Sequence, residues 1–113
     1  MRIWNLTPHP MHYDDGTNQR VIPSDGNCWV RQIDQPAEPI DGMATVKTQY
    51  SGVEGIPSEV QPGDVLIVST IVAEAFERGT RPIGVAVLVP DTGSTCKRDP
   101  NGRIVSVSRF IRK

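Results

Sequence analysis

The sequence lacks the long apolar runs and the export signals that membrane and secreted proteins carry. Its longest apolar runs, Val65–Val68 and Val85–Val89, are far shorter than the roughly 20 residues that a membrane span needs. Residues 1–12 contain no apolar core followed by a small-residue cleavage site, so no secretory signal is predicted. We therefore expect a cytoplasmic protein that makes no contact with a membrane.

Cysteine is also scarce, which argues against a disulfide scaffold or a zinc module. Cys28 and Cys96 are the two cysteines, and they lie too far apart in sequence to form a CxxC pair. A structural zinc site needs about four clustered ligands. We expect two reduced, partly buried thiols, with a disulfide or a reactive cysteine as the alternative.

Histidine and carboxylate residues occur together only near the N-terminus. His9 and His12 are followed by Asp14 and Asp15, a set that resembles a metal cluster in composition. The flanking prolines prevent a helix from aligning positions three residues apart, so the segment is predicted to be a strand end turning into a loop. We therefore predict no metal ligands.

No catalytic signature is present either. The glycines do not form GxGxxG or GxxxxGK, and neither a nucleophile elbow nor HExxH occurs. The sequence thus predicts a protein without catalytic residues or a cofactor. A small hydrolase stays open as an alternative, with a general base that cannot be singled out among His9, His12 and the carboxylates.

The sequence does contain turn-forming residues at short intervals. Its 113 residues fit one domain, spanning 1–113, and include ten prolines and ten glycines with β-branched residues between them. The pattern predicts an α+β fold: a small, mainly antiparallel twisted sheet or partial β-barrel with one short packed helix over about 70–78. The predicted strands are Arg2–Leu6, Gln19–Ile22, Cys28–Ile33, Ala44–Tyr50, Asp64–Ser69, Ile83–Val89 and Arg103–Ile111.

The helix is predicted over Thr70–Arg78 by its periodicity and by its ends. Apolar residues share one stripe, Ser69 or Thr70 can cap the start, and Gly79 suits the position after the last turn. A helix of this length needs a sheet to dock on. The residues of the predicted stripe are Ile71, Val72, Ala75 and Phe76.

Turns and loops are predicted from Asp, Asn, Pro and Gly clusters. Residues 13–16 and 99–102 are predicted turns, and the second closes a hairpin from Ser94–Lys97 to Arg103–Val107. The last strand has an irregular alternation that indicates a bulge or bend near Ser108. Asp34–Asp41, with two prolines and three acids, and Ile56–Gly63 are predicted to be exposed loops.

Charge is unevenly distributed along the chain. Residues 1–92 carry six Lys/Arg against twelve Asp/Glu, a formal charge of −6, whereas residues 93–113 carry a formal charge of +5. Such asymmetry can mark an anion-binding surface. The alternative is that the basic segment pairs with the acidic part, within one subunit or between two.

A phosphate-binding site is predicted from the arginines of this basic segment. Arginine binds phosphate bidentately, and a helix start adds free N–H groups and a partial positive charge. An aromatic ring can stack on a base, although core packing is the alternative for each ring. The predicted ligand-binding residues are Arg103, Arg109, Arg98, Ser69, Thr70 and Phe110.

Four segments resemble a set of small uncharacterised phage and prophage proteins. They are Asn5-Leu6-Thr7-Pro8-His9, Val65–Phe76, Val87–Pro90 and Arg98–Ile104. The resemblance implies one intact domain and names no chemistry. In size, β content and basic C-terminal segment, the chain is also similar in type to phage anti-defence sponges. Those are homo-oligomers that sequester cyclic nucleotides or cyclic ADP-ribose derivatives of systems such as Thoeris and CBASS.

The expected function is therefore sequestration of a small phosphorylated signalling nucleotide, without turnover, by a homo-oligomer in the host cytoplasm. Duplex nucleic acid is not an expected partner, because the acidic part of the chain would repel it. Two alternatives stay open. One is a protein-interaction module, as a host-enzyme inhibitor or a minor virion component, that uses the loops at 34–41 and 56–63. The other is a small nucleotide hydrolase.

Overall fold

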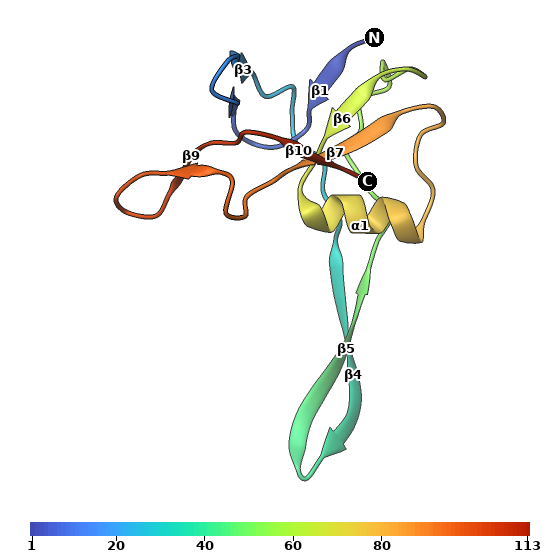
Figure 1. Ribbon diagram of the computed structural model, residues 1–113. Coiled ribbons are helices and arrows are strands. Elements are labelled where there is room, and N and C mark those ends of the chain that lie inside the picture. Colours follow the sequence, from blue (N-terminus) through green and yellow to red (C-terminus); the bar gives the residue numbers. More distant parts are fainter.

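The fold class is α+β, as the sequence predicts. The computed structural model describes residues 1–113, with a single short helix and ten strands (Figure 1). No helix in it has the length and hydropathy to cross a membrane. In chain order the elements are β1 Ile3–Asn5, β2 Met11–Asp14, β3 Gln19–Ile22, β4 Gln32–Ile40, β5 Met43–Tyr50, β6 Val65–Ile67, α1 Thr70–Arg78, β7 Ala86–Pro90, β8 Lys97–Arg98, β9 Ile104–Ser106 and β10 Phe110–Arg112.

A four-stranded sheet of order β1-β6-β7-β10 forms the centre of the molecule. β1, β6 and β7 run parallel, and β10 is antiparallel to β7. The sequence predicts mainly antiparallel strands, and this holds for the three two-stranded sheets but not for the central one. The physical reason is the connection: α1 follows β6 directly and returns the chain to begin β7 beside it in the same direction. The sheets do not close into a barrel.

The helix α1 covers one face of the central sheet and builds the core with it. Ser69 caps its start, with the Val72 N–H donating to Ser69 Oγ at 3.4 Å, and Gly79 follows its end, as predicted. One position of the predicted stripe is wrong, because Ile71 is 43% exposed and Ala73 is buried in its place. The core residues are Trp4, Leu6, Cys28, Leu66, Val68, Val72, Ala73, Phe76, Val85, Val87 and Val89.

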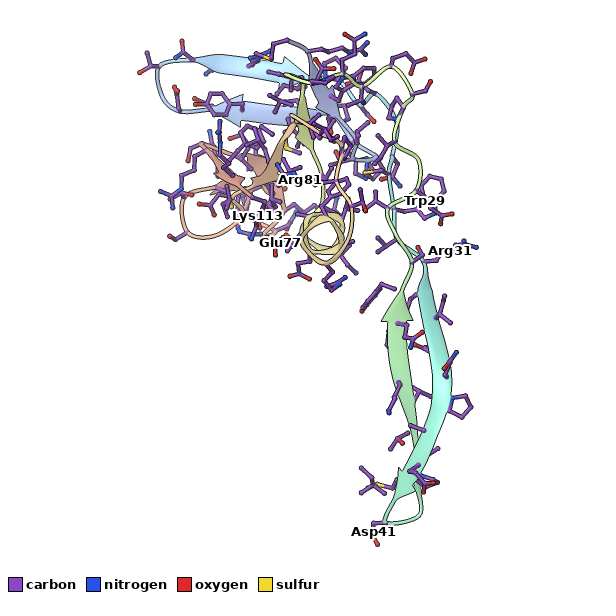
Figure 2. All side chains as sticks on the ribbon, turned by 90° about the vertical axis from the view of Figure 1, so that its right-hand side faces the viewer. Trp29, Arg31, Asp41, Glu77, Arg81 and Lys113 are labelled. Carbon is purple, nitrogen blue, oxygen red and sulfur yellow. The ribbon has the colours of Figure 1, made fainter.

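A long two-stranded hairpin, which we call the arm, projects from this body (Figure 1). It consists of β4, β5 and the two-residue turn Asp41-Gly42, and Asp41 lies at its tip, far from the body (Figure 2). The prediction of a loop over Asp34–Asp41 is therefore wrong, because residues 34–40 belong to a strand, whereas the predicted exposure is correct for all of these residues except the half-buried Ala37. Asp41 and Gly42 have φ values of 51° and 73°, the conformation that Asp-Gly favours in tight hairpins.

Prolines are tolerated in β4 because each strand of a two-stranded ribbon is an edge strand. Pro36 lies opposite Val46 in the register. Pro39 lies in a bulge, where the register shifts between Ala37 and Ile40. The two prolines and three acids of this segment favoured a loop, and for this reason the strand was not predicted.

At the base of the arm, hydrogen bonds and an ion pair join its two chain segments to each other. The Ser51 N–H donates to the Arg31 carbonyl at 2.9 Å, and the Arg31 N–H donates to Ser51 Oγ at 2.8 Å. Trp29 forms an isolated bridge with Glu54, and Arg31 Nε lies 2.8 Å from Glu54 Oε2. The strand predicted over Cys28–Ile33 is thus reduced to this bridge and the start of β4 (Figure 2).

The C-terminal segment is bent where its alternation breaks down. β8 and β9 form the predicted hairpin, and β10 begins only at Phe110, beyond the bend around Ser108. Between them, the Val107 N–H donates to the His12 carbonyl and the Asp14 N–H donates to the Val107 carbonyl, both at 2.9 Å. Those two bonds join β2 to the C-terminal segment.

Asp64 joins the start of the chain to the loop before β6. Its carboxylate accepts hydrogen bonds from Trp4 Nε1 and from the backbone N–H groups of Arg2 and Gln61, each at 3.0 Å. The Trp4 bond, followed by the two backbone bonds, lowers the pKa of Asp64. The ionised form is therefore favoured in the folded state.

We expect this carboxylate to contribute to the loss of stability in acid. A folded-state pKa below the unfolded value gives stability that is present above about pH 4 and lost as pH falls through the folded pKa. In urea titrations between about pH 5 and pH 2, Asp64→Asn should lose less stability than the parent protein does. Equal losses in the two proteins would show that Asp64 does not contribute.

Candidate functional site

The face of the central sheet opposite α1 carries a hollow. Trp4, Leu66 and Val87 belong to the core on the helix side of the sheet. Because side chains alternate along a strand, the residues next to them in each strand point away from the helix. The β2–β3 hairpin approaches this second face and leaves a cavity of about 410 Å³ between them. Its lining residues are Ile3, Ile67, Leu88 and Phe110 from the sheet, Tyr13, Arg20 and Ile22 from the hairpin, and Arg109.

The hairpin holds Tyr13 and Arg20 together at the rim. They are directly opposite in the β2–β3 register, so their side chains leave the hairpin on the same face. The turn is fixed by Asp15, whose Oδ1 accepts the N–H groups of Thr17 and Asn18 at 2.9 and 2.6 Å. The Asn18 bond is the main reason that the pKa of Asp15 falls to about 2.

Two aromatic rings form part of the wall. The rings of Tyr13 and Phe110 are stacked, with centroids 6.0 Å apart and planes at 12°. The Tyr13 hydroxyl donates to Asp15 Oδ2 at 2.8 Å, and this bond raises the pKa of the phenol. The hydroxyl bond and the stacking therefore hold in one orientation a ring that lines the hollow.

Arg109 is held at the hollow by an acid of the same subunit. Its Nε lies 2.6 Å from Asp91 Oδ2, and Asp91 Oδ1 also accepts the Gly93 N–H at 3.0 Å. Arg109 is the main cause of the lowered pKa of Asp91. The sequence left open the alternative that the basic segment pairs with acids of the same subunit. For Arg109, the structure shows this pairing. The side chain is still 66% exposed, and its two terminal nitrogens make no protein hydrogen bond.

A second, smaller hollow adjoins the first. Its volume is about 210 Å³, and it shares Tyr13 and Arg20 with the larger one. Lys97 adds another positive charge to its lining, whereas Asp14 is the acid there. Its remaining lining residues are His12, Gln19, Val21, Val105 and Ser106.

The six predicted ligand-binding residues are not brought together. Of these, only Arg109 and Phe110 line the hollows. The guanidinium of Arg98 is occupied by backbone carbonyls, because it donates to Gly102 of its own hairpin at 2.8 Å and to Thr92 at 3.0 Å. Arg103 is exposed and lines neither hollow.

Ser69 and Thr70 also lie outside both hollows. The Ser69 hydroxyl is used as the helix cap, accepting the Val72 N–H. The prediction that a helix start, three arginines and a ring converge on one ligand is therefore corrected to a site around Arg109 and Phe110.

The residues that the β2–β3 hairpin supplies were not predicted from the sequence. Gln19–Ile22 is a predicted strand and residues 13–16 a predicted turn, so a signal was present. Recognising Met11–Asp14 as the partner strand would have placed Arg20 opposite Tyr13. The proline-rich approach to Met11 obscured it.

The histidine, cysteine and carboxylate side chains do not gather into a metal cluster. No group of three or more His, Cys, Asp or Glu is close enough together to hold a metal ion. Both cysteines are free thiols. Burial raises the pKa of Cys28 to about 11, so this thiol stays protonated near neutral pH. In comparisons with known proteins, no family model, curated protein or solved structure matches the chain.

Proposed function

We propose that the protein binds a small phosphorylated nucleotide in the 410 Å³ hollow and sequesters it without turnover. One observation carries this proposal: two arginines, Arg20 and Arg109, and two stacked rings, Tyr13 and Phe110, line the same hollow. Guanidinium groups bind phosphate, and aromatic faces stack on bases. The volume lies in the range of about 300–1,000 Å³ that small-molecule sites occupy.

Charge and chemistry of the lining support binding over catalysis. The larger hollow has no carboxylate, imidazole or thiol in its lining. Its one hydroxyl, that of Tyr13, donates to Asp15 and has a raised pKa, so it is poorly suited to act as a nucleophile or general base. Asp91 holds the guanidinium of Arg109 through Nε, which leaves the two terminal nitrogens free to bind a phosphate. A cyclic nucleotide or cyclic ADP-ribose derivative in the cytoplasm of a phage host is the ligand class we propose.

The test is calorimetry with a panel of cyclic dinucleotides and ADP-ribose derivatives, comparing Arg20→Ala and Arg109→Ala with the parent protein. Each substitution should weaken binding by about 1.5–2.5 kcal/mol, because each removes a charge-assisted contact. Arg103→Ala is the matched control, since Arg103 is an exposed arginine outside the hollow. This variant should bind the nucleotide with the affinity of the parent protein.

Recovery of the ligand distinguishes sequestration from hydrolysis. Ligand released by heating a saturated complex should be chemically intact by chromatography and mass spectrometry. Altered ligand would support the hydrolase instead, with His12 and Asp14 of the smaller hollow as the first residues to test. Binding that is equally strong in Arg20→Ala, Arg109→Ala and Arg103→Ala would refute the site.

The arm favours a second function, that of a protein-interaction module. Large apolar side chains are exposed along its length, including Ile40, Val46 and Met43, each 60% exposed or more. Exposed apolar side chains that gather on one projecting element are typical of a protein contact. This function uses a different part of the molecule from the nucleotide site.

A further inference from the structure

The arm is a long ribbon with almost no support from the body. The radius of gyration is 17.0 Å, against about 13 Å for a compact chain of this length, and the arm accounts for the elongated shape (Figures 1 and 2). Along both strands every residue is exposed except Ala37 and Thr45, which are half-buried. A lone two-stranded ribbon is at best marginally stable in water, whereas three or more strands can be stable.

The two free edges of the arm differ in their ability to accept another strand. The β4 edge contains Pro36, Pro39 and a bulge, and it carries the acids Asp34 and Glu38. Proline, bulges and charges are devices that block edge pairing. The β5 edge has eight residues, no proline, and a single charge at Lys47. Strand addition is therefore possible at β5 and blocked at β4.

We infer that two copies of the chain pair through their β5 edges, antiparallel, to form a four-stranded sheet of order β4-β5-β5-β4. The inference rests on the interaction function proposed above, names its partner, and does not depend on the nucleotide function. A strand paired antiparallel with its own copy is related to it by a two-fold axis, so each chain supplies the edge that the other needs. The new sheet has four strands and therefore satisfies the requirement of three or more strands, which the isolated arm does not.

Side-chain chemistry favours a register centred on Val46, an exposed apolar residue in the middle of β5. With Val46 opposite Val46 of the second copy, Lys47 lies opposite Thr45 and Gln49 opposite Met43, so no like charges face each other. Alternation then places Ala44, Val46, Thr48 and Tyr50 on one face, beside Pro36 of β4. A stripe of apolar and β-branched residues thus crosses the two-fold axis.

The blocked β4 edges stop the assembly at two copies. After pairing, both outer edges of the four-stranded sheet are β4 strands with their prolines and acids. A third copy has no edge to join. The inferred complex is therefore a closed dimer and not a fibre.

Cysteine trapping tests the register directly. In a Cys96→Ser background, Val46→Cys should form a disulfide-linked dimer under mild oxidation, because the two thiols meet at the axis. Gln35→Cys is the control on the outer strand, where three strand spacings of about 4.8 Å separate the two copies, and it should stay unlinked. Cross-linking at Val46 no greater than at Gln35 would overturn the inferred register.

Light scattering on the unmodified chain tests the dimer itself. The parent protein should have twice the 12.4 kDa chain mass at about 100 µM. Val46→Lys, which sets like charges opposite each other at the axis, should shift it to the chain mass. Ile33→Lys, an exposed change on β4, should leave the dimer intact. A monomeric parent, or a dimer that Val46→Lys leaves intact, would overturn the inference. Calorimetry on Val46→Lys should still detect the nucleotide, so failure of either proposal is recognised separately.

Discussion

Replacing Phe76 with alanine is expected to lower the free energy of unfolding by about 4 kcal/mol. Phe76 lies on the buried face of α1, is 3% exposed, and belongs to the core that the helix forms with the central sheet. Truncating a buried phenylalanine removes its transfer free energy and leaves a cavity, and both effects destabilise the folded state. A nine-residue helix has little stability of its own, so this contact holds it in place.

Chemical denaturation monitored by the fluorescence of the two tryptophans measures this change. Ile71→Ala is the matched control, because Ile71 lies on the same helix but outside the buried face. Its cost should stay within about 1 kcal/mol. Similar losses at both positions would show that the helix packs through a different stripe from the one described.

Replacing Asn5 with alanine is expected to cost about 3 kcal/mol, because several buried polar groups would lose their partners together. Asn5 is fully buried at 0% exposure. Its Nδ2 donates to the carbonyls of His9 at 2.9 Å and Ile22 at 3.0 Å. Its Oδ1 accepts the N–H and the hydroxyl of Thr7, at 3.2 and 2.6 Å. The one amide thus joins β1 to the following loop and to β3.

Urea unfolding of Asn5→Ala against Asn27→Ala checks this expectation. Asn27 is exposed and its side chain makes no hydrogen bond, so its replacement should change stability by less than about 0.5 kcal/mol. Asn5→Ala should also weaken nucleotide binding, since Ile22 lines the hollow through the strand that Asn5 holds. Equal stability of the two variants would contradict the role of Asn5.

This network gives a structural reason for the Asn5-Leu6-Thr7-Pro8-His9 segment. Leu6 is buried in the core, and Asn5, Thr7 and His9 satisfy one another through main-chain and side-chain hydrogen bonds. The segment was singled out in the sequence for its resemblance to phage proteins. The structure shows that it turns the chain from β1 towards β2.

Local signals in the sequence predicted local structure well. The helix has the bounds Thr70–Arg78 in both prediction and structure, because its periodicity, its Ser69 cap and Gly79 all act within a few residues. β3 has its predicted bounds, and β1, β5, β6 and β7 overlap theirs. Of the two strands of the arm, β4 was not predicted although Asp41-Gly42 is a local signal, because the prolines of β4 are compatible with an edge strand as well as with a loop.

Long-range pairing could not be predicted from local signals. β1 pairs in parallel with β6, and β10 pairs antiparallel with β7, through contacts that the periodicity of the sequence does not indicate. The hollow draws its lining from β1, β2, β3, β6, β7 and the C-terminal segment. The charge asymmetry indicated Arg109, which lies in the basic C-terminal segment. It did not indicate Arg20, because Arg20 belongs to the acidic part of the chain.

The position of the arm between β1 and β6 affects how the chain reaches its native state. Hairpins with a tight two-residue turn form in about 1–10 µs, whereas pairings between distant segments must first overcome the entropy of closing a long loop. Arg31 and Ser51 are hydrogen-bonded to each other, so a formed arm removes about twenty residues from the loop that β1 and β6 must close. The arm, which extends furthest from the body, thereby reduces the conformational search needed to assemble the central sheet.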